Sequence, residues 1–327
     1  MKKQFDQITW DERLQADLEA LLRLAIREDC EPDGDWTTAA LVPDDASGRA
    51  DVVARQAGVI AGLRGVETAF RLVDARLRWS PESEDGRSVR RGDRVGRIEG
   101  PAASLLTAER PVLNLLGRLS GIATLTRAYV EAVAGTKARI YDTRKTTPGW
   151  RRLEKYAVRC GGGCSHRTGL FDAVLIKDNH LAVGAGSAGT NGHRAQHGRL
   201  VPAGRYTPAE AVARARRFVE ETASDSTRRG MIIEVEVDTL EQLEGVLPAG
   251  PDIVLLDNMS PAELAEAVKC RDARNPEVEL EASGGVRLET VRQIAFSGVD
   301  RISVGALTHA AVWLDIGMDW LPGDAAG

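Results

Sequence analysis

The chain has 327 residues, of which 43% are hydrophobic and 28% charged, and its formal net charge is −5. This length allows one large domain or two of medium size, and the composition is ordinary for a soluble enzyme. The acidic balance with few aromatic residues argues against a nucleic-acid surface, and no apolar run approaches the ~20 residues that span a bilayer.

The first hundred residues predict an α+β lobe. Leucines at helical spacing predict a helix over residues 10–28. Short β-like runs with glycine punctuation follow over residues 48–62 and 86–99, and Arg91-Gly92-Asp93 marks a tight turn between strands. We therefore expect a helix together with an antiparallel sheet in this part of the chain.

The remainder predicts alternating strands and helices. A long helix is expected over Ala108–Val133. Later helices begin at Thr207 and Ser260 with a capping box and proline at the first helical position. The strands between them are rich in Val, Ile and Leu, as expected when both faces of a parallel sheet are covered. Units of this kind predict a parallel α/β barrel, with strands at Arg139–Asp142, Ala173–Lys177, Met231–Val237, Ile253–Asp257, Val278–Ala282 and Arg301–Val304.

Residues 181–206 interrupt the alternation. They are rich in Gly, Ala and His and show little periodicity, which predicts an inserted surface loop. No Cys or carboxylate spacing supports metal binding by His193 and His197, so we interpret them as solvated histidines.

Basic residues are concentrated around the first two barrel strands. Residues 139–177 contain nine Lys or Arg and three Asp or Glu, in a chain that is acidic overall. Arginine recognises carboxylate or phosphate bidentately, and lysine supplies a point charge. This cluster predicts a small ligand with several negative charges. Arg151, Arg152 and Lys155 have the helical spacing of a surface stripe, so we interpret them as a solvated face.

Polar residues and glycines follow the other strands, at the edge where α/β barrels carry their chemistry. Ser283-Gly284-Gly285 and Gly305-Ala306 precede helices, whose free N–H groups and dipole attract phosphate. Carboxylates beside such a site favour Mg²⁺, and the alternative is structural pairing with Arg or Lys. Glu234 shares a strand face with Glu236, which leaves open which of them faces the ligand.

The cysteines favour a reducing compartment. Cys30, Cys160, Cys164 and Cys270 lack the spacing of a disulfide framework, and the N-terminus lacks the apolar core of a signal peptide. We therefore expect a cytoplasmic protein. A metal site of Cys160, Cys164 and His166 is disfavoured, because the spacing is not C-x-x-C and no second ligand pair follows.

Seven motifs, taken in order, resemble the quinolinate phosphoribosyltransferase family: Asp-Thr-Arg-Lys-Thr-Thr-Pro-Gly, Gly-Gly-Gly-x-x-His-Arg, Ile-Lys-Asp-Asn-His, Glu-Val-Glu-Val, Leu-Leu-Asp-Asn, Ser-Gly-Gly and Val-Gly-Ala-Leu-Thr-His. The resemblance implies an α/β fold, with an N-terminal α+β sandwich lobe and a partly open α/β barrel of the type II phosphoribosyltransferase kind. It places the lobe at residues 1–109, with 311–327 packed on it, and the barrel at 110–310 with the inserted loop 181–206.

The family makes nicotinate mononucleotide, CO₂ and pyrophosphate from quinolinate and phosphoribosyl pyrophosphate, with Mg²⁺, in NAD biosynthesis. The resemblance therefore implies a homodimer or hexamer in which Arg110 reaches the partner's site. The resemblance implies that quinolinate is bound by Thr143, Arg144, His166, Arg167 and Lys177. Phosphoribosyl pyrophosphate and its metal are assigned Lys145, Glu236, Asp257, Ser283, Gly284, Gly285, Gly305 and His309. Lys145, Glu236 and Asp257 are the expected catalytic residues, and the two carboxylates would hold Mg²⁺ directly or through water.

Two alternatives are open. One is a related phosphoribosyltransferase acting on nicotinate or another heterocyclic acid, which needs fewer cations than the four that Arg110, Arg144, Arg167 and Lys177 supply. The other is a phosphate-binding barrel without catalytic activity. It predicts that a carboxylate or lysine of the set is missing, and all are present.

Overall fold

The computed structural model describes residues 2–184, 193–194, 200–201 and 206–321. The chain folds into two compact α/β units. Unit 1 contains Met1–Asp6, Ala132–Arg144 and His166–Val304, and unit 2 contains Gln7–Glu131, Lys145–Ser165 and Gly305–Gly327. This division differs from a single boundary after residue 109, because helix α4 (Ala102–Ala132) runs through that point without a break.

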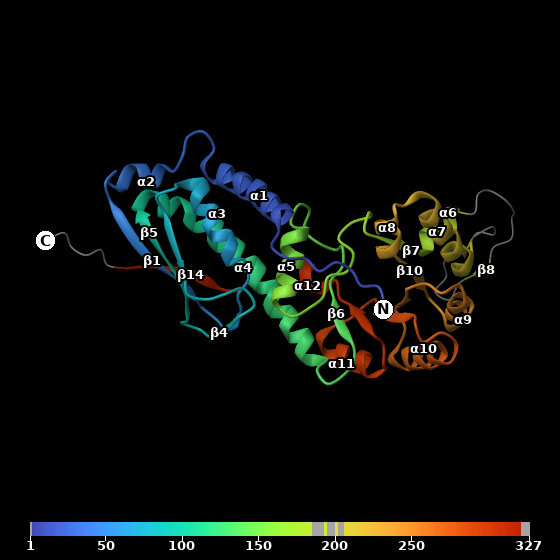
Figure 1. Ribbon diagram of the computed structural model, residues 1–327. Helices are drawn as coiled ribbons and strands as arrows, with labels where there is room; N and C mark the ends of the chain where they lie inside the picture. The colour runs from blue at the N-terminus through green and yellow to red at the C-terminus, as the bar shows by residue number, and fades with distance from the viewer. Residues whose placement is uncertain (1, 185–192, 195–199, 202–205, 322–327) are drawn as a thin grey trace. The chain divides into compact units, whose positions relative to one another are not determined.

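Unit 2 is built on an antiparallel sheet with the strand order β14-β1-β5-β3 (Figure 1). Strand β14 (Ile316–Trp320) pairs with β1 (Ser47–Ala54), so the C-terminal strand lies beside one of the first strands of the chain. The other strands and helices of unit 2 are α1 (Glu12–Cys30), α2 (Trp36–Leu41), β2 (Gly58–Val59), α3 (Leu63–Val73), β3 (Arg78–Pro81), β4 (Ser88–Val89), β5 (Arg94–Pro101), α5 (Arg151–Cys160) and α12 (Ala306–His309).

The helices of unit 2 follow from their apolar spacing. The predicted helix over residues 10–28 is confirmed as α1, which buries Leu14, Leu18 and Leu22 and begins where Asp11 accepts a hydrogen bond from the Leu14 N–H. Helix α4 begins six residues before the predicted start and contains Pro111 within its length. No helix in the described part of the chain has both the length and the hydrophobicity of a membrane span.

Unit 1 is built on six parallel strands in the order β6-β13-β12-β11-β10-β7. They confirm all six predicted strands: β6 (Arg139–Tyr141), β7 (Ala173–Ile176), β10 (Ile232–Val237), β11 (Ile253–Asp257), β12 (Glu279–Ser283) and β13 (Arg301–Ser303). Strands β6 and β7 form the two edges of the sheet, so the barrel is partly open. The strands are buried almost throughout, which explains their Val, Ile and Leu content.

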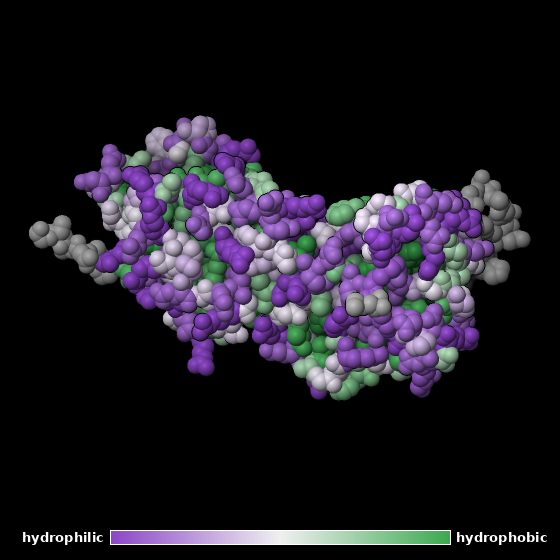
Figure 2. Space-filling model, viewed as in Figure 1, coloured by the Kyte–Doolittle hydropathy of each residue, from purple (hydrophilic) through white to green (hydrophobic). Residues whose placement is uncertain are grey.

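Helices connect the strands of unit 1 (Figure 1). They are α6 (Asp178–Gly184), α7 (Pro208–Thr222), α8 (Asp225–Gly230), α9 (Leu240–Val246), the 3₁₀ turn η1 (Leu247–Ala249), α10 (Pro261–Arg274) and α11 (Leu288–Phe296). The predicted capping boxes at Thr207 and Ser260 are both confirmed. The predicted inserted loop lies mostly outside the described residues, which within it include α6 and the short pair β8 (His193–Arg194) and β9 (Leu200–Val201). Hydrophilic residues cover most of the face seen in Figure 2.

The N-terminal residues belong to unit 1, although nothing in their sequence pattern predicts this. The Lys3 ammonium donates to the Met231 carbonyl at 2.7 Å and lies 3.2 Å from Asp252, at the amino ends of β10 and β11. The Phe5 ring is 5% exposed and lies 4.3 Å from the His166 ring and 5.2 Å from the Arg301 guanidinium carbon. Phe5 therefore completes the core of the barrel, and Lys3 holds the segment at the amino ends of β10 and β11.

Replacing Phe5 with alanine should lower the free energy of unfolding by about 3 kcal/mol, because the change removes a buried ring and leaves a cavity. Phe5→Leu, which fills most of the volume, should lower it by about 1 kcal/mol. Urea unfolding followed by circular dichroism measures both. Equal stability of Phe5→Ala and the unaltered protein would contradict this role of the N-terminal segment.

Candidate active site

The carboxyl ends of the barrel strands gather the polar residues of unit 1. Asp257 at the end of β11 lies opposite Ser283 at the end of β12 in the strand register. Glu236 lies near the end of β10, and Lys177 directly follows β7. The Lys177 ammonium lies 2.8 Å from a carboxylate oxygen of Glu236. The structure thus brings together basic and acidic side chains that are far apart in the sequence.

Two arginines of unit 1 form a cationic pair. The Nε atoms of Arg144 and Arg167 are both buried and have no hydrogen-bond partner among the described residues. Burial and the positive charge of Arg144 lower the pKa of Arg167. Buried donors without partners are unfavourable unless a ligand supplies acceptors. The arrangement therefore suits an anion with more than one acceptor group.

His166 is the residue that connects this pair to the barrel interior. Its backbone N–H donates to Asp142 at 2.8 Å, and its Nδ1 accepts from the Arg167 N–H at 2.8 Å. Nε2 faces two buried carboxylates, 3.1 Å from Glu234 and 3.4 Å from Glu281.

The protonation of His166 responds to opposing effects. Burial favours the neutral ring, whereas Glu234 and Glu281 favour the protonated ring and raise the pKa of His166. The hydrogen bond from Arg167 to Nδ1 favours the neutral ring with its hydrogen on Nε2. Nε2 carries a hydrogen in both states, so its attraction to the two carboxylates does not depend on which state is populated.

Glu234 and Glu236 have different surroundings although they share a strand face. Glu234 is fully buried and faces His166, whereas Glu236 is partly exposed and faces Lys177. Burial raises the pKa of the Glu236 carboxyl, against the opposing effect of Lys177. Glu236 is therefore the more exposed of the two carboxylates and lies nearer the carboxyl end of β10.

Two sets of side chains in unit 1 offer carboxylate oxygens to a metal ion. Glu236 and Asp257 are close enough for the charge of Asp257 to raise the pKa of Glu236, and both are partly exposed at adjacent strand ends. These oxygen donors fit Mg²⁺, which takes one or two carboxylates with phosphates and water.

Within the described chain, the cluster of His166, Glu234 and Glu281 also brings three ligand atoms within 4.8 Å of one another. It fits a metal poorly, because metal on Nε2 would place the hydrogen on Nδ1, where the Arg167 N–H already donates.

The glycine turn after β12 is shaped by close backbone approach. Gly284 has φ +91°, and a Cβ added there would lie 2.2 Å from the Asn258 side-chain oxygen. Gly285 follows with φ +59°, and a Cβ there would meet nothing within 4 Å. Two successive residues with positive φ therefore follow β12, a backbone conformation that favours glycine.

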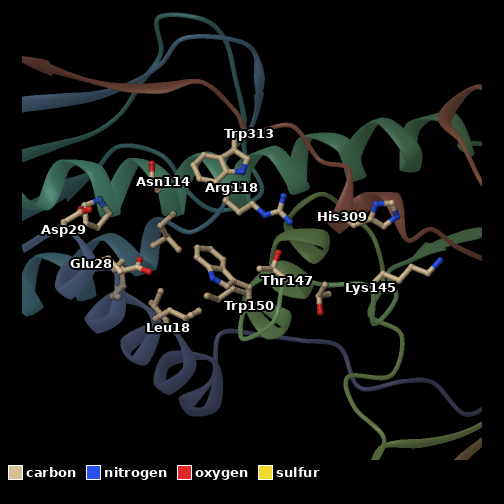
Figure 3. Close-up of a pocket in the computed structure, with 17 residues that line it drawn as sticks. Leu18, Glu28, Asp29, Asn114, Arg118, Lys145, Thr147, Trp150, His309 and Trp313 are labelled. Atoms are coloured by element: carbon tan, nitrogen blue, oxygen red, sulfur yellow. The ribbon is translucent and has the colours of Figure 1, made fainter. Parts of the chain in front are cut away.

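Three predicted site residues lie together in unit 2. A Cβ on Gly305 would lie 2.9 Å from the Lys145 Cδ and 3.4 Å from the His309 Nε2. Lys145 and His309 lie at one end of a cavity of about 930 Å³, with Trp150 and Thr147 near its middle and Leu18 beyond them (Figure 3). The cavity combines an apolar interior with a basic end.

A buried ion pair, for which the sequence pattern offers no signal, holds this group in place. The Glu154 carboxylate is fully buried and accepts from the Arg118 Nη2 at 2.5 Å and from the Thr147 hydroxyl at 2.8 Å. Arg118 also donates to the Thr308 carbonyl at 2.6 Å, and the Thr308 hydroxyl donates to the Lys145 carbonyl at 2.7 Å. Glu154 therefore fixes the backbone on both sides of Lys145 and His309.

Arg110 lies elsewhere in unit 2. Its side chain is 64% exposed and lies 3.7 Å from Glu109. It lines a second cavity, of about 390 Å³, with Thr38 and Leu41, and does not line the cavity that contains Lys145. Leu41, which lines the same cavity, is 76% exposed, so an exposed apolar side chain lies near this cation.

The interpretation of Arg151, Arg152 and Lys155 as a solvated stripe is wrong for Lys155, which is fully buried. Arg152 pairs with Asp17 of α1 at 3.1 Å, and Arg151 donates to the Thr146 hydroxyl at 3.1 Å. Helix α5 packs between other elements of unit 2, so its charged residues make internal contacts.

Comparison with known proteins agrees with the geometry. The family model of the quinolinate phosphoribosyl transferase N-terminal domain matches residues 35–120, and that of the C-terminal domain matches residues 122–319. The nicotinate-nucleotide pyrophosphorylase [carboxylating] of Mycobacterium leprae is 43% identical over 302 residues, covering 91% of this chain and 95% of that protein. Quinolinate phosphoribosyltransferase [decarboxylating] 1b of Nicotiana tabacum is 36% identical, covering 92% of this chain and 82% of its own.

Solved structures extend the similarity to the fold. The nicotinate-nucleotide pyrophosphorylase of Francisella tularensis superimposes with a TM-score of 0.82 at 33% identity. The match covers 97% of this chain and 100% of the Francisella chain. The motifs at the strand ends, the two family models and these relatives lead to one conclusion. The chain belongs to the quinolinate phosphoribosyltransferase family.

Proposed function

We propose that the protein transfers the phosphoribosyl group of phosphoribosyl pyrophosphate to the ring nitrogen of quinolinate, with decarboxylation, in de novo NAD biosynthesis. The products are nicotinate mononucleotide, CO₂ and pyrophosphate. The observation that carries the proposal is the cationic pair Arg144 and Arg167, whose buried Nε atoms have no partner among the described residues. Quinolinate has two adjacent carboxylates, and two fixed guanidiniums match them in charge and geometry.

Lys177 supplies a third cation at the carboxyl ends of the strands, directly after β7, and His166 accepts a hydrogen bond from the backbone N–H of Arg167. Desolvating two carboxylates without cations would cost several kcal/mol per charge. Pre-positioned guanidiniums lower that cost and orient the ring nitrogen toward the sugar. Lys177 is already paired with Glu236, so a quinolinate carboxylate would compete with Glu236 for the ammonium. That exchange would free Glu236 for the developing positive charge on the ribose.

Phosphate recognition is assigned to the glycine turns and to Lys145. Gly284 and Gly285 form a turn after β12, beside Ser283, and the backbone N–H groups of this turn would bind phosphate. In unit 2, Gly305 and His309 lie against the Lys145 side chain. Such groups stabilise the negative charge that collects on departing pyrophosphate.

Glu236 and Asp257 would hold Mg²⁺ directly or through water. When bound, the ion would neutralise charge on the pyrophosphate and hold its oxygens in place. The carboxylates themselves orient water and favour positive charge at the ribose C1.

The reaction is a displacement followed by loss of CO₂. The ring nitrogen forms a bond to the ribose C1 while the bond from C1 to the pyrophosphate oxygen breaks, and that electron pair leaves with pyrophosphate. The ring nitrogen is then cationic and accepts electron density when the bond to the neighbouring carboxylate breaks. The ring carbon takes a proton in place of CO₂. The protein's part is positioning and electrostatic stabilisation, with no covalent bond to the enzyme.

Quinolinate labelled with ¹³C in the carboxyl beside the ring nitrogen tests this function. Purified protein with phosphoribosyl pyrophosphate and Mg²⁺ should release labelled CO₂ and nicotinate mononucleotide in equal amounts. EDTA should abolish both, and added Mg²⁺ should restore them. Absence of both products with folded protein would overturn the proposal.

We further propose a homodimer or larger assembly in which Arg110 completes the partner's site, and a cytoplasmic location. The exposed Arg110, with the exposed Leu41 in the same cavity, supports a protein interface, since apolar patches rimmed by polar residues mark such surfaces. Four free cysteines support a reducing compartment.

Mixing two inactive variants tests the shared site. Arg110→Ala and Lys145→Ala protomers, each inactive alone, should recover up to about a quarter of the unaltered activity when mixed and allowed to exchange, because half of the random dimers carry one intact site. Arg110→Ala mixed with Arg110→Ala/Lys145→Ala is the matched control and should stay inactive. No recovery despite verified exchange would place both residues in one subunit's site.

A further inference from the structure

Two buried glutamates of the barrel interior have no role in the assignments above. The side chains of Glu234 on β10 and Glu281 on β12 are both fully buried, and both face the His166 Nε2. Their four carboxylate oxygens form no hydrogen bond of regular geometry within the described structure, although the His166 Nε2 lies 3.1 Å from Glu234 and 3.4 Å from Glu281. A pair of buried carboxylates costs several kcal/mol in desolvation unless a cation or N–H group faces them. Stability alone therefore gives little reason for this pair.

Two basic side chains, Arg301 and His166, lie near the pair of glutamates, and they contact it to different degrees. The Arg301 Nη1 lies 3.8 Å from Glu281, but its Nε lies 2.6 Å from Glu279, and its guanidinium stacks on Tyr141 at 4.4 Å. Arg301 is thus held chiefly by Glu279, and His166 is the nearest donor that Glu234 and Glu281 share. The strongest electrostatic effect of the pair falls on the His166 ring.

The His166 ring is coupled directly to Arg167. Nδ1 accepts the Arg167 N–H, and Asp142 accepts the His166 N–H on the other side of the residue. The Phe5 ring packs on the imidazole at 4.3 Å and limits its rotation. When Glu234 and Glu281 hold the ring at Nε2, the ring in turn holds the backbone N–H of Arg167 at Nδ1.

Arg167 needs such a restraint because Arg144 repels it. Both guanidiniums carry a buried Nε without a partner in the described chain, and each would move toward solvent if its backbone allowed. Holding two like charges in place before the ligand arrives is pre-organisation, which raises affinity by removing the rearrangement from the binding step.

We propose that Glu234 and Glu281 are positioning residues, which act through His166 to hold Arg167 beside Arg144 for the dianionic pyridine substrate. The inference rests on the proposed function. It assigns to the acidic pair a role in quinolinate affinity without contact to quinolinate.

The variants Glu234→Gln and Glu281→Gln test this role, because glutamine keeps the volume and removes the charge. Each should raise the KM for quinolinate about tenfold while kcat and the KM for phosphoribosyl pyrophosphate stay within about twofold. Glu279→Gln is the matched control. It removes a buried carboxylate from β12, the strand that carries Glu281, and this carboxylate pairs with Arg301 and not with His166. It should leave the KM for quinolinate unchanged.

A second readout reports on His166 itself. The chain has five histidines, so ¹⁵N-labelled imidazole signals can be assigned individually by single replacements. The Nε2 and Nδ1 shifts of His166 should change in Glu234→Gln and Glu281→Gln and stay constant in Glu279→Gln. If a glutamine variant does not fold, Glu281→Asp keeps the charge, withdraws the carboxylate and should give a smaller rise in KM.

An unchanged KM for quinolinate in Glu234→Gln and Glu281→Gln, or an equal rise in Glu279→Gln, would overturn the inference. If the unaltered protein does not use quinolinate, the proposed function fails instead. The His166 shifts then still decide whether the two glutamates hold the ring.

Discussion

Replacing Arg167 with methionine should lower kcat/KM for quinolinate about 1,000-fold, equivalent to about 4 kcal/mol of lost transition-state stabilisation. The reason is that methionine leaves a quinolinate carboxylate facing an apolar side chain in a buried site. Arg167→Lys is the matched control and should lose about tenfold, since it keeps the charge and loses the planar fork. Steady-state kinetics with quinolinate as the varied substrate measure both.

The same replacement should leave folding stability unchanged or raise it by about 1 kcal/mol. Arg167 is buried, its Nε has no partner among the described residues, and Arg144 lowers its pKa. A methionine removes a buried charge and its unsatisfied donor, and such a replacement is often stabilising. A loss of stability that paralleled the loss of activity would show that Arg167 supports the fold and would contradict a binding role.

Replacing Glu154 with leucine should lower the free energy of unfolding by about 3–5 kcal/mol, because one partner of a buried ion pair is lost. Arg118 is 13% exposed and would be left without its counter-charge, and Thr147 would lose the acceptor for its hydroxyl. Denaturant midpoints measure the loss.

A double-mutant cycle separates the ion pair from packing. Arg118→Met combined with Glu154→Leu should be closer to the unaltered protein than Glu154→Leu alone, because no unpaired charge remains. Activity should nevertheless stay low in the double variant, since Arg118 no longer holds the Thr308 carbonyl near Lys145. A Glu154→Leu variant as stable as the unaltered protein would contradict this account of the cavity in unit 2.

The barrel could be predicted from the sequence because its signals are local. Each strand is a short Val, Ile and Leu run, and the helix starts at Thr207 and Ser260 carry their capping residues within four positions. The polar residues at the strand ends follow from the same pattern, since parallel strands present their carboxyl ends at one edge.

The remaining features depend on contacts between distant residues. Phe5 lies in a segment without periodicity, and its burial depends on His166 and Arg301. The sequence pattern predicts Lys155 to be a surface charge, because nothing in its own segment shows that other elements bury this face of α5. The burial of Glu154 likewise depends on Arg118, which is distant in the sequence. Glu234 could not be distinguished from Glu236, because the two share a strand face and differ only in depth.

We expect the cationic pair Arg144 and Arg167 to bind two carboxylates of one ligand. A comparison of quinolinate with nicotinate tests this most directly. Both are assayed with phosphoribosyl pyrophosphate and Mg²⁺, and nicotinate mononucleotide is measured. We predict turnover of quinolinate and a kcat/KM for nicotinate at least about 1,000-fold lower, because nicotinate lacks one of the two charges and leaves a guanidinium unpaired. Equal or preferred use of nicotinate would contradict the claim and identify a single-carboxylate enzyme of the same fold.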